Sequence, residues 1–160
     1  IHAYTKLYGI KAVILRYANV VGPRLRHGVI YDLLMKLKKN REVLEVLGDG
    51  TQVRSYIYID DAMEATIIAW RNSREGYEVY NIGSEDWITV NDVVNIMLSE
   101  LGLTNTRIVY KPVLYGIGWP GDVKRIALAI DKLKKLGFTP RYKSREAVAK
   151  TVKELVKELL

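Results

Sequence analysis

The chain has 160 residues, of which 49% are hydrophobic and 27% charged, with no cysteine and a net charge of +7. That length is enough for a buried core in one ordinary domain, or for a large part of a bigger protein. The lack of cysteine excludes disulfides, thiolate metal sites and a cysteine nucleophile, and we expect a cytoplasmic protein. The longest stretch without a charged side chain is only residues 112–121, whereas a bilayer span needs roughly 20 apolar residues. We therefore expect no membrane partner.

The basic charge is spread along the chain. Lysine and glutamate alternate near the C-terminus, as in residues 153–154 and 157–158, and Gln52 is the only glutamine. This bias is typical of heat-adapted proteins, whose charged side chains form a solvated surface. We therefore expect no nucleic-acid partner. The alternative, a polyanion-binding surface, predicts a steep salt dependence of DNA affinity.

The hydrophobic pattern predicts helices and strands in alternation. The first half begins with the end of a helix that stops at Gly9, and continues with a strand of the kind that is buried on both faces of a parallel sheet. In chain order, the predicted elements of this half are a helix over 1–8, strands over 12–17 and 43–47, with a helix over 29–39 between them, a strand over 55–59, and a helix over 61–70 capped by Asp60.

The second half continues the alternation. Its predicted elements are a strand over 79–82, a helix that Thr89 opens and Gly102 ends, a strand over 107–110, a loop over 112–121, a helix over 131–136 and a last helix from Ser144. The order of elements indicates an α/β protein. Since the chain begins within a helix and supplies few parallel neighbours for strand 12–17, we expect the C-terminal part of a larger protein.

Five segments carry distinctive patterns of glycine, proline and charged residues. They are 16–23 (RYANVVGP), 48–61 (GDGTQVRSYIYIDD), 80–84 (YNIGS), 119–123 (WPGDV) and 135–140 (KLGFTP). In this order and at this spacing they resemble segments of the extended short-chain dehydrogenases, in the NAD-dependent nucleotide-sugar epimerase/dehydratase family. The resemblance spans almost the whole chain and is greatest to archaeal or thermophilic UDP-glucose 4-epimerases.

The resemblance implies a fold and a division into domains. The fold would be α/β: the C-terminal part of a Rossmann-like doubly wound sheet plus the small α/β substrate-binding domain. Residues 1–27 would end the dinucleotide-binding domain, and residues 28–160 would be mainly the substrate-binding domain. Within the latter, 55–70 and 79–83 are candidates for return to the Rossmann sheet.

The catalytic motifs of the family are not in this sequence. The family uses a tyrosine with a lysine four residues later, and none of the tyrosines here has lysine at that position. A G-x-G-x-x-G pattern at Gly116, Gly118 and Gly121 is rejected as a dinucleotide site because Pro120 interrupts it and no buried strand feeds it. We therefore predict no catalytic residue here, an inactive isolated chain, NAD held mainly by an N-terminal half, and a homodimer for the complete enzyme.

Three polar residues are the main candidates for binding a nucleotide sugar. By resemblance, Asn19 would contact the nucleotide sugar, Arg54 the diphosphate and Asp122 the ribose hydroxyls. A guanidinium can bind a diphosphate with two parallel hydrogen bonds, which lysine cannot. The alternatives are a turn residue for Asn19, a surface ion pair of Arg54 with Asp49, and a turn-capping carboxylate for Asp122.

Further candidates surround these three. By resemblance, Tyr17 would lie near the nicotinamide, or else be a buried core aromatic. Tyr56 would hydrogen-bond the ligand or merely pack, and Trp119 would stack on a base or sugar, or pack as part of a lid. The same comparison places three apolar residues beside the base, although each fits a simple core as well: Val29, Leu44 and Leu47.

The sequence leaves three functions open. The first is the UDP-sugar-binding part of an NAD-dependent epimerase, the second is a dehydratase or reductase of the same family, and the third is a non-catalytic nucleotide-binding module. His2 and His27 have no spaced ligand partners, so no metal site is expected. The hexose, the nucleotide base and the choice between NAD and NADP are not encoded in recognisable residues.

Overall fold

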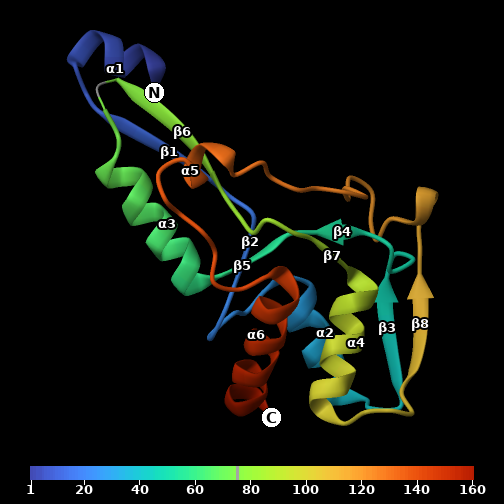
Figure 1. Cartoon of the computed structure of the whole chain (residues 1–160). Coiled ribbons are helices and arrows are strands. Elements are labelled where there is room, and N and C mark those ends of the chain that lie inside the picture. The colour runs from blue at the N-terminus through green and yellow to red at the C-terminus, as the bar shows by residue number, and fades with distance from the viewer. Residues whose placement is uncertain (75) are drawn as a thin grey trace.

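The structure is a computed structural model that describes residues 1–74 and 76–160. It consists of an arm and a larger body (Figure 1). The arm contains α1 (His2–Tyr8), β1 (Ala12–Tyr17), α3 (Ile59–Arg71), β6 (Tyr77–Ile82) and the short α5 (Asp131–Lys134). The body contains α2 (Gly28–Lys39), β3 (Val43–Leu47), α4 (Val90–Leu101), β8 (Arg107–Lys111), the 3₁₀ turn η1 (Leu114–Gly116) and α6 (Ser144–Leu159). Four short strands lie between arm and body: β2 (Asn19–Val21), β4 (Val53–Arg54), β5 (Tyr56–Tyr58) and β7 (Ile88–Thr89).

The strands form four pairs, three of them parallel. β1 pairs with β6, β2 with β5 and β3 with β8, all parallel, whereas β4 and β7 are antiparallel. Parallel neighbours need crossover connections, and these connections contain helices: α2 lies between β2 and β5, and α4 lies between β3 and β8. The α/β class predicted from the order of elements is confirmed.

Two hydrophobic clusters hold the fold together. The cluster of the body packs α2, α4 and α6 around β3, with Leu34, Leu44 and Val148 fully buried. The cluster of the arm packs the alanines of α3 against β6 and the segment after α5, and it includes the buried Phe138. β5 contributes to both clusters, because Tyr56 and Tyr58 belong to the first and Ile57 to the second. Successive side chains of a strand point to opposite faces, which explains this division.

Both predicted end signals of α4 are confirmed. Thr89 forms a capping box with Asp92: the Thr89 hydroxyl accepts from the Asp92 amide at 3.0 Å, and the Asp92 carboxylate accepts from the Thr89 amide at 2.9 Å. The Thr89 hydroxyl also donates to the Asp92 carboxylate at 2.6 Å, and this bond, together with that from the Thr89 amide, lowers the pKa of Asp92. Gly102 ends the same helix in the left-handed conformation, with φ of 66°.

Other predictions need correction. The predicted strand over 55–59 is shorter in the structure. Its first residue, Ser55, lies between β4 and β5, and its last residue already begins α3. The predicted cap at Asp60 is wrong, because α3 begins at Ile59, two residues before the predicted start, and its N-cap is Tyr58. The helix predicted over 131–136 ends at Lys134, and the two-residue and three-residue strands β7 and β2 were not predicted. β1, whose sequence is typical of a strand buried on both faces, is half-buried at Ala12–Leu15 and exposed at Arg16 and Tyr17 within these 160 residues.

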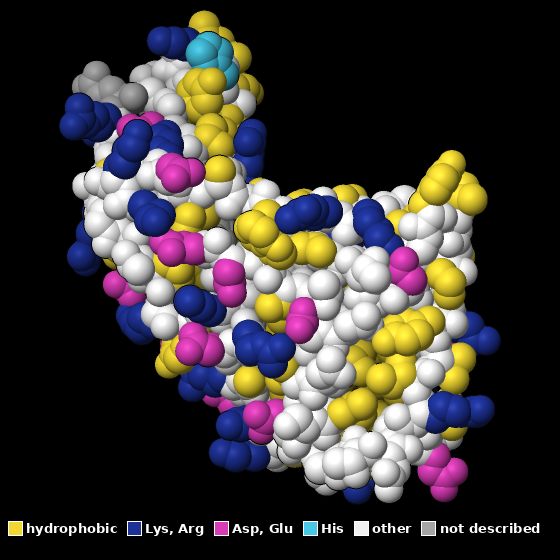
Figure 2. Space-filling view, turned by 45° about the vertical axis from the view of Figure 1, so that its right-hand side comes forward, with side chains coloured by type: hydrophobic (Ala, Val, Ile, Leu, Met, Phe, Trp, Pro, Cys, Tyr) yellow, Lys and Arg dark blue, Asp and Glu magenta, His cyan; other side chains and the backbone are white. Residues whose placement is uncertain are grey.

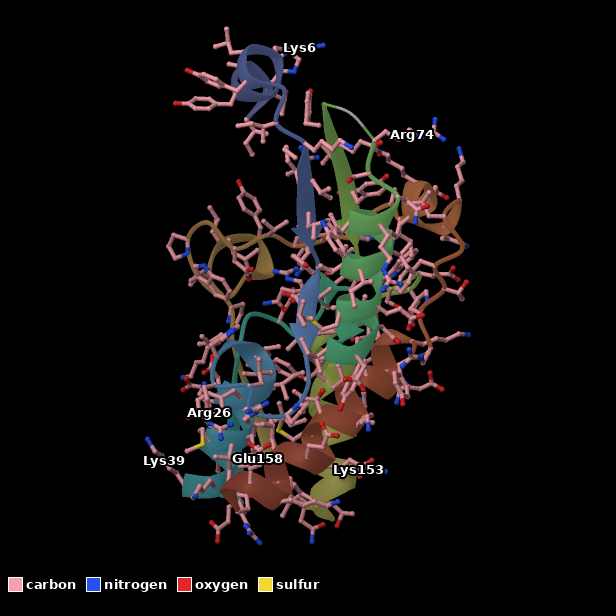
Figure 3. All side chains as sticks on the ribbon, turned by 90° about the vertical axis from the view of Figure 1, so that its left-hand side faces the viewer. Lys6, Arg26, Lys39, Arg74, Lys153 and Glu158 are labelled. Carbon is pink, nitrogen blue, oxygen red and sulfur yellow. The ribbon has the colours of Figure 1, made fainter. Side chains whose placement is uncertain are left out.

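Basic side chains lie at both ends of the molecule. Figure 3 places Lys6 and Arg74 at the far end of the arm, and Lys39 and Lys153 at the opposite end of the body. At the body's end of the molecule, the Arg26 guanidinium donates to the Glu158 carboxylate at 3.0 Å (Figure 3). This bond links the segment before α2 to the end of α6. Among the residues that the structure describes, no helix is both long and apolar enough to cross a membrane.

Candidate functional site

The candidate site is a cavity of about 540 Å³ between the start of α2, the end of β3 and the short strands β2, β4 and β5. Asn19 begins β2, directly after the carboxyl end of β1, which is where ligands of parallel α/β sheets bind. Seven of the nine predicted site residues line this cavity: Asn19, Val29, Leu47, Arg54, Tyr56, Trp119 and Asp122. The remaining two, Tyr17 and Leu44, do not line it.

A glycine turn sets the position of Arg54. Gly48 and Gly50 both have positive φ, at 86° and 79°, so the chain reverses sharply after β3. A Cβ atom on Gly48 would lie 1.7 Å from the side-chain nitrogen of Gln52, which packs into the turn and donates to the Leu47 carbonyl at 3.2 Å. Arg54 follows on β4, paired with Ile88 of β7. The turn and the antiparallel pair therefore hold the base of the Arg54 side chain in place.

Arg54 forms an ion pair with Asp122. The two side chains are 17% and 2% exposed, and the guanidinium nitrogen lies 2.7 Å from the carboxylate. The other guanidinium nitrogen donates to the Val53 carbonyl at 2.8 Å. The alternative ion pair considered from the sequence, Arg54 with Asp49, does not form. Asp49 instead bonds Lys124 at 2.6 Å, and this hydrogen bond is the main cause that lowers the pKa of Asp49 to about 2.

Asn19 and Tyr56 add hydrogen-bonding groups to the same cavity. The Asn19 side-chain amide donates to the Ser55 carbonyl at 3.0 Å, so this residue also links β2 to the junction of β4 and β5. Tyr56 is buried, and burial raises its pKa to about 12. The phenol of Tyr56 therefore keeps its proton at neutral pH and acts as a neutral hydrogen-bonding group.

A second cavity, of about 390 Å³, adjoins the first. Asn19, Arg54, Trp119 and Asp122 line both cavities. Tyr17 lines only the second, where it is 45% exposed and its hydroxyl lies 2.6 Å from the Thr66 hydroxyl. Within these 160 residues, Tyr17 is therefore not part of the buried core. The roles of all these residues in binding stay predictions.

The apolar wall of the main cavity differs in part from the predicted one. Val29 and Leu47 line it as expected, but Leu44 is fully buried in the cluster of the body and lines neither cavity. Val46 lies two residues along β3 on the same face and lines the wall. The alternation of side chains along β3 indicated that Leu44 and Val46 share a face, but it could not show which of them reaches the cavity. Further lining residues that the sequence analysis did not select include Val21, Leu25, Asp32, Lys36 and Gln52.

The arrangement suits an anion with an apolar part. Arg54 supplies the guanidinium, Asn19 and Tyr56 supply neutral polar groups, and the wall around Val29 and Val46 is apolar. Lys36 also lines the cavity, with its ammonium bonded to the Glu45 carbonyl at 3.0 Å. In the described part of the chain, no group of three or more histidine, aspartate or glutamate side chains could hold a metal ion.

Comparisons with known proteins identify the family. Residues 1–83 match the model of the NAD dependent epimerase/dehydratase family. The chain is 45% identical to a crystal structure of a UDP-galactose 4-epimerase, with a TM-score of 0.85 over 99% of this chain and 50% of that one. The chain is 32% identical to the UDP-glucose 4-epimerase of Thermotoga maritima, whose crystal structure contains UDP-glucose. The TM-score is 0.80, over 99% of this chain and 50% of that one.

Curated relatives agree with the structural matches. UDP-glucuronate 4-epimerase of Thermodesulfobacterium geofontis is 30% identical over 94% of this chain and 45% of its own length. Nucleotide-sugar dehydratases also match, and several of the matched structures are complexes with NAD. The chain spans about half the length of these epimerases and dehydratases. With its family model, its Rossmann-like α/β fold and its motifs in agreement, the chain belongs to the NAD-dependent epimerase/dehydratase family.

Proposed function

We propose that this chain is the nucleotide-sugar-binding part of an NAD-dependent sugar epimerase of the UDP-glucose 4-epimerase kind. The observation that carries the proposal is the convergence of Asn19, Arg54 and Tyr56 on one apolar-walled cavity beyond the end of β1. A nucleoside diphosphate needs such a combination: a guanidinium for the phosphates, polar groups for hydroxyls and an apolar surface for the base.

The proposed roles follow from the chemistry of each side chain. Arg54 binds the diphosphate, Asn19 contacts the nucleotide sugar, and Tyr56 donates from its neutral phenol. Val29 and Leu47, together with Val46, form the wall beside the base, and Trp119 stacks on the base or the sugar. Two separate hydrophobic clusters, one in the arm and one in the body, support the proposed division into the end of a Rossmann domain and a substrate-binding domain.

The second cavity fits the nicotinamide end of NAD, because Tyr17 presents an exposed aromatic side chain there and shares the space with Asn19 and Trp119. Bound NAD would supply the hydride acceptor and donor for the sugar carbon, while this chain would contribute Tyr17 beside the nicotinamide. The remaining contacts to NAD are proposed to come from a part of the protein outside these 160 residues.

Epimerisation makes a particular demand on this chain. The sugar must turn over between removal and return of the hydride, so binding has to be strong at the nucleotide and weak at the hexose. Arg54 and the apolar wall would supply binding energy far from the reacting carbon, which keeps the diphosphate in place during the rotation.

Calorimetric titration of the purified protein with UDP, UDP-glucose and dTDP-glucose tests the proposal. We expect UDP and UDP-glucose to bind with similar affinity, since the diphosphate and the base carry most of the contacts. A protein that binds none of the three would contradict the proposed function.

We further propose that the 160-residue chain alone is inactive, because it has no tyrosine followed four residues later by lysine. The expected result is no interconversion of UDP-glucose and UDP-galactose when this chain is assayed alone with NAD. Measurable turnover under these conditions would show that the chemistry resides here.

A dehydratase of the same family is the second candidate. The observation in its favour is that dTDP-glucose 4,6-dehydratase of Xanthomonas campestris matches over 95% of this chain, as far as the epimerases do. In the assay above with the complete enzyme, an epimerase yields the C4 epimer, whereas a dehydratase releases water and leaves a 4-keto-6-deoxy sugar.

A further inference from the structure

Part of the wall of the main cavity is a loop, residues 22–27, which joins β2 to α2. Leu25 and His27 of this loop line the cavity. Leu25 also packs against the hydrophobic cluster of the body. Because these two residues belong to neither a helix nor a strand, no backbone ladder fixes where they lie. A contact from outside the loop must hold this part of the wall in place.

The backbone of the loop is strained at Arg24. Its φ is 61°, in the left-handed region, which residues with a Cβ atom disfavour by a factor of about 5–30. The Arg24 side chain is exposed and lines neither cavity. A strained residue keeps its conformation only where the surrounding structure holds it. The loop would therefore relax into another shape without a contact that holds Arg24.

Glu158, near the end of α6, supplies this contact. One of its carboxylate oxygens accepts from the Arg24 backbone amide at 3.1 Å, and the other accepts from the Arg26 guanidinium at 3.0 Å. Another nitrogen of that guanidinium donates to the Leu25 carbonyl at 3.0 Å. The hydrogen bond from Arg26 is the main cause that lowers the pKa of Glu158, so the carboxylate is charged at neutral pH. Leu25 thus lies between two neighbours that one carboxylate holds, and Figure 3 shows Arg26 and Glu158 together at this end of the body.

We propose that Glu158 is a positioning residue for the main cavity: it holds the loop in the strained conformation in which Leu25 and His27 complete the wall. The inference rests on the proposed function, because it concerns the same cavity. Without the carboxylate, Arg24 would leave the left-handed region, and only a fraction of the molecules would present the complete wall. The apparent affinity for a nucleotide falls in proportion to that fraction. α6 would in this way contribute to binding although Glu158 itself lines neither cavity.

The alternative is that Glu158 merely fastens the end of α6 to the body. Lys153 of the same helix offers a matched control, because it forms an ion pair with Glu100 of α4 at 3.5 Å. The side chains of Glu100 and Glu158 are 26% and 27% exposed, and Lys153 and Glu100 line neither cavity. If attachment of α6 were all that mattered, Glu100→Gln would affect UDP binding as much as Glu158→Gln.

Calorimetric titrations with UDP test the inference on the unmodified protein, Glu158→Gln, Arg24→Asn, the double variant of these two, and Glu100→Gln. We expect Glu158→Gln to bind UDP roughly three- to tenfold more weakly, and Glu100→Gln to bind within about twofold of the unmodified protein. Asparagine adopts the left-handed conformation far more readily than arginine does. The double variant should therefore recover an affinity within about twofold of that of Arg24→Asn alone. A residue that only stabilises the fold would not be rescued in this way.

Limited proteolysis provides a second measurement, which needs no ligand. Trypsin cleaves after arginine, and cleavage within a folded protein follows the population in which the segment is released. In Glu158→Gln, cleavage after Arg26 should accelerate about threefold or more, whereas Glu100→Gln should leave its rate unchanged. Addition of Arg24→Asn should reverse most of this increase. Mass spectrometry of the fragments identifies the cleaved bond, at a temperature well below the unfolding midpoint.

The outcomes separate this inference from the proposed function. An unmodified protein that does not bind UDP overturns both. If the unmodified protein binds UDP, the inference alone fails under any of four results: Glu158→Gln binds normally, Glu100→Gln matches it, Arg24→Asn does not restore the affinity, or cleavage after Arg26 is not accelerated. If Glu158→Gln does not fold, Arg26→Gln removes one of the two bonds to the carboxylate, and the same titrations with and without Arg24→Asn decide the question.

Discussion

Replacement of Arg54 by alanine is expected to weaken UDP binding about ten- to a hundredfold. Hydrogen bonds to charged groups contribute about 1.5–3 kcal/mol, and each ~1.4 kcal/mol changes the dissociation constant tenfold. The variant also leaves the buried Asp122 carboxylate without the guanidinium that lies 2.7 Å away, which lowers the stability of the fold. Calorimetric titration measures the affinity, and thermal unfolding of the same sample shows how much of the protein is folded.

Two other arginine variants serve as controls for this result. Arg54→Lys keeps the positive charge but loses the planar pair of donors, so its affinity should lie between those of the unmodified protein and Arg54→Ala. Arg145 forms an exposed ion pair with Asp92 at 3.1 Å and lines neither cavity. Arg145→Ala should therefore bind UDP normally. Equal affinities for Arg54→Ala and Arg145→Ala would show that Arg54 does not bind the diphosphate.

Substitution of Leu44 by alanine should lower the free energy of unfolding by about 2–5 kcal/mol, the range for large-to-small changes in a packed core. Leu44 is fully buried among the helices of the body and lines neither cavity. In a chain of this size the midpoint of thermal unfolding should fall by on the order of 5–15 °C. The folded protein should still bind UDP with unchanged affinity at a temperature well below that midpoint.

Leu47 is the matched control for this substitution, since it lies on the same strand. Its side chain is 47% exposed and forms part of the cavity wall. Leu47→Ala should therefore reduce the affinity for UDP with little change in the unfolding midpoint. If Leu44→Ala lost as much affinity for UDP as Leu47→Ala, Leu44 would have a role in binding.

Local signals in the sequence predicted most elements, and the failures have a physical pattern. Thr89 was identified correctly because its capping partner, Asp92, is three residues away. At Asp60 the same reasoning failed, because α3 begins two residues before the predicted start and its N-cap, Tyr58, makes no side-chain capping bond that the sequence could signal. β2 and β7 have three residues or fewer. Such strands exist only through pairing with distant partners, so no periodicity within them could predict them.

The residues of the candidate site were predicted from the sequence mainly through the family resemblance. Residue types and motif order selected most of the side chains that line the cavity. The ion pair between Arg54 and Asp122 spans 68 residues of sequence, and no pattern of charges along the chain distinguishes Asp122 from Asp49 as the partner. The sequence also could not show how far each side chain lies from the cavity. Leu44 and Val46 share one face of β3, yet of these two only Val46 lines the cavity.

β5 has three residues, and its two faces belong to different cores. A shift of this strand by one position would turn Ile57 toward the body and its tyrosine neighbours toward the arm, so both interiors would be mispacked in a single step. The chain should for this reason tolerate insertions and deletions poorly between β4 and α3. It should accept them far more readily at exposed turn positions such as residues 104–105, between α4 and β8.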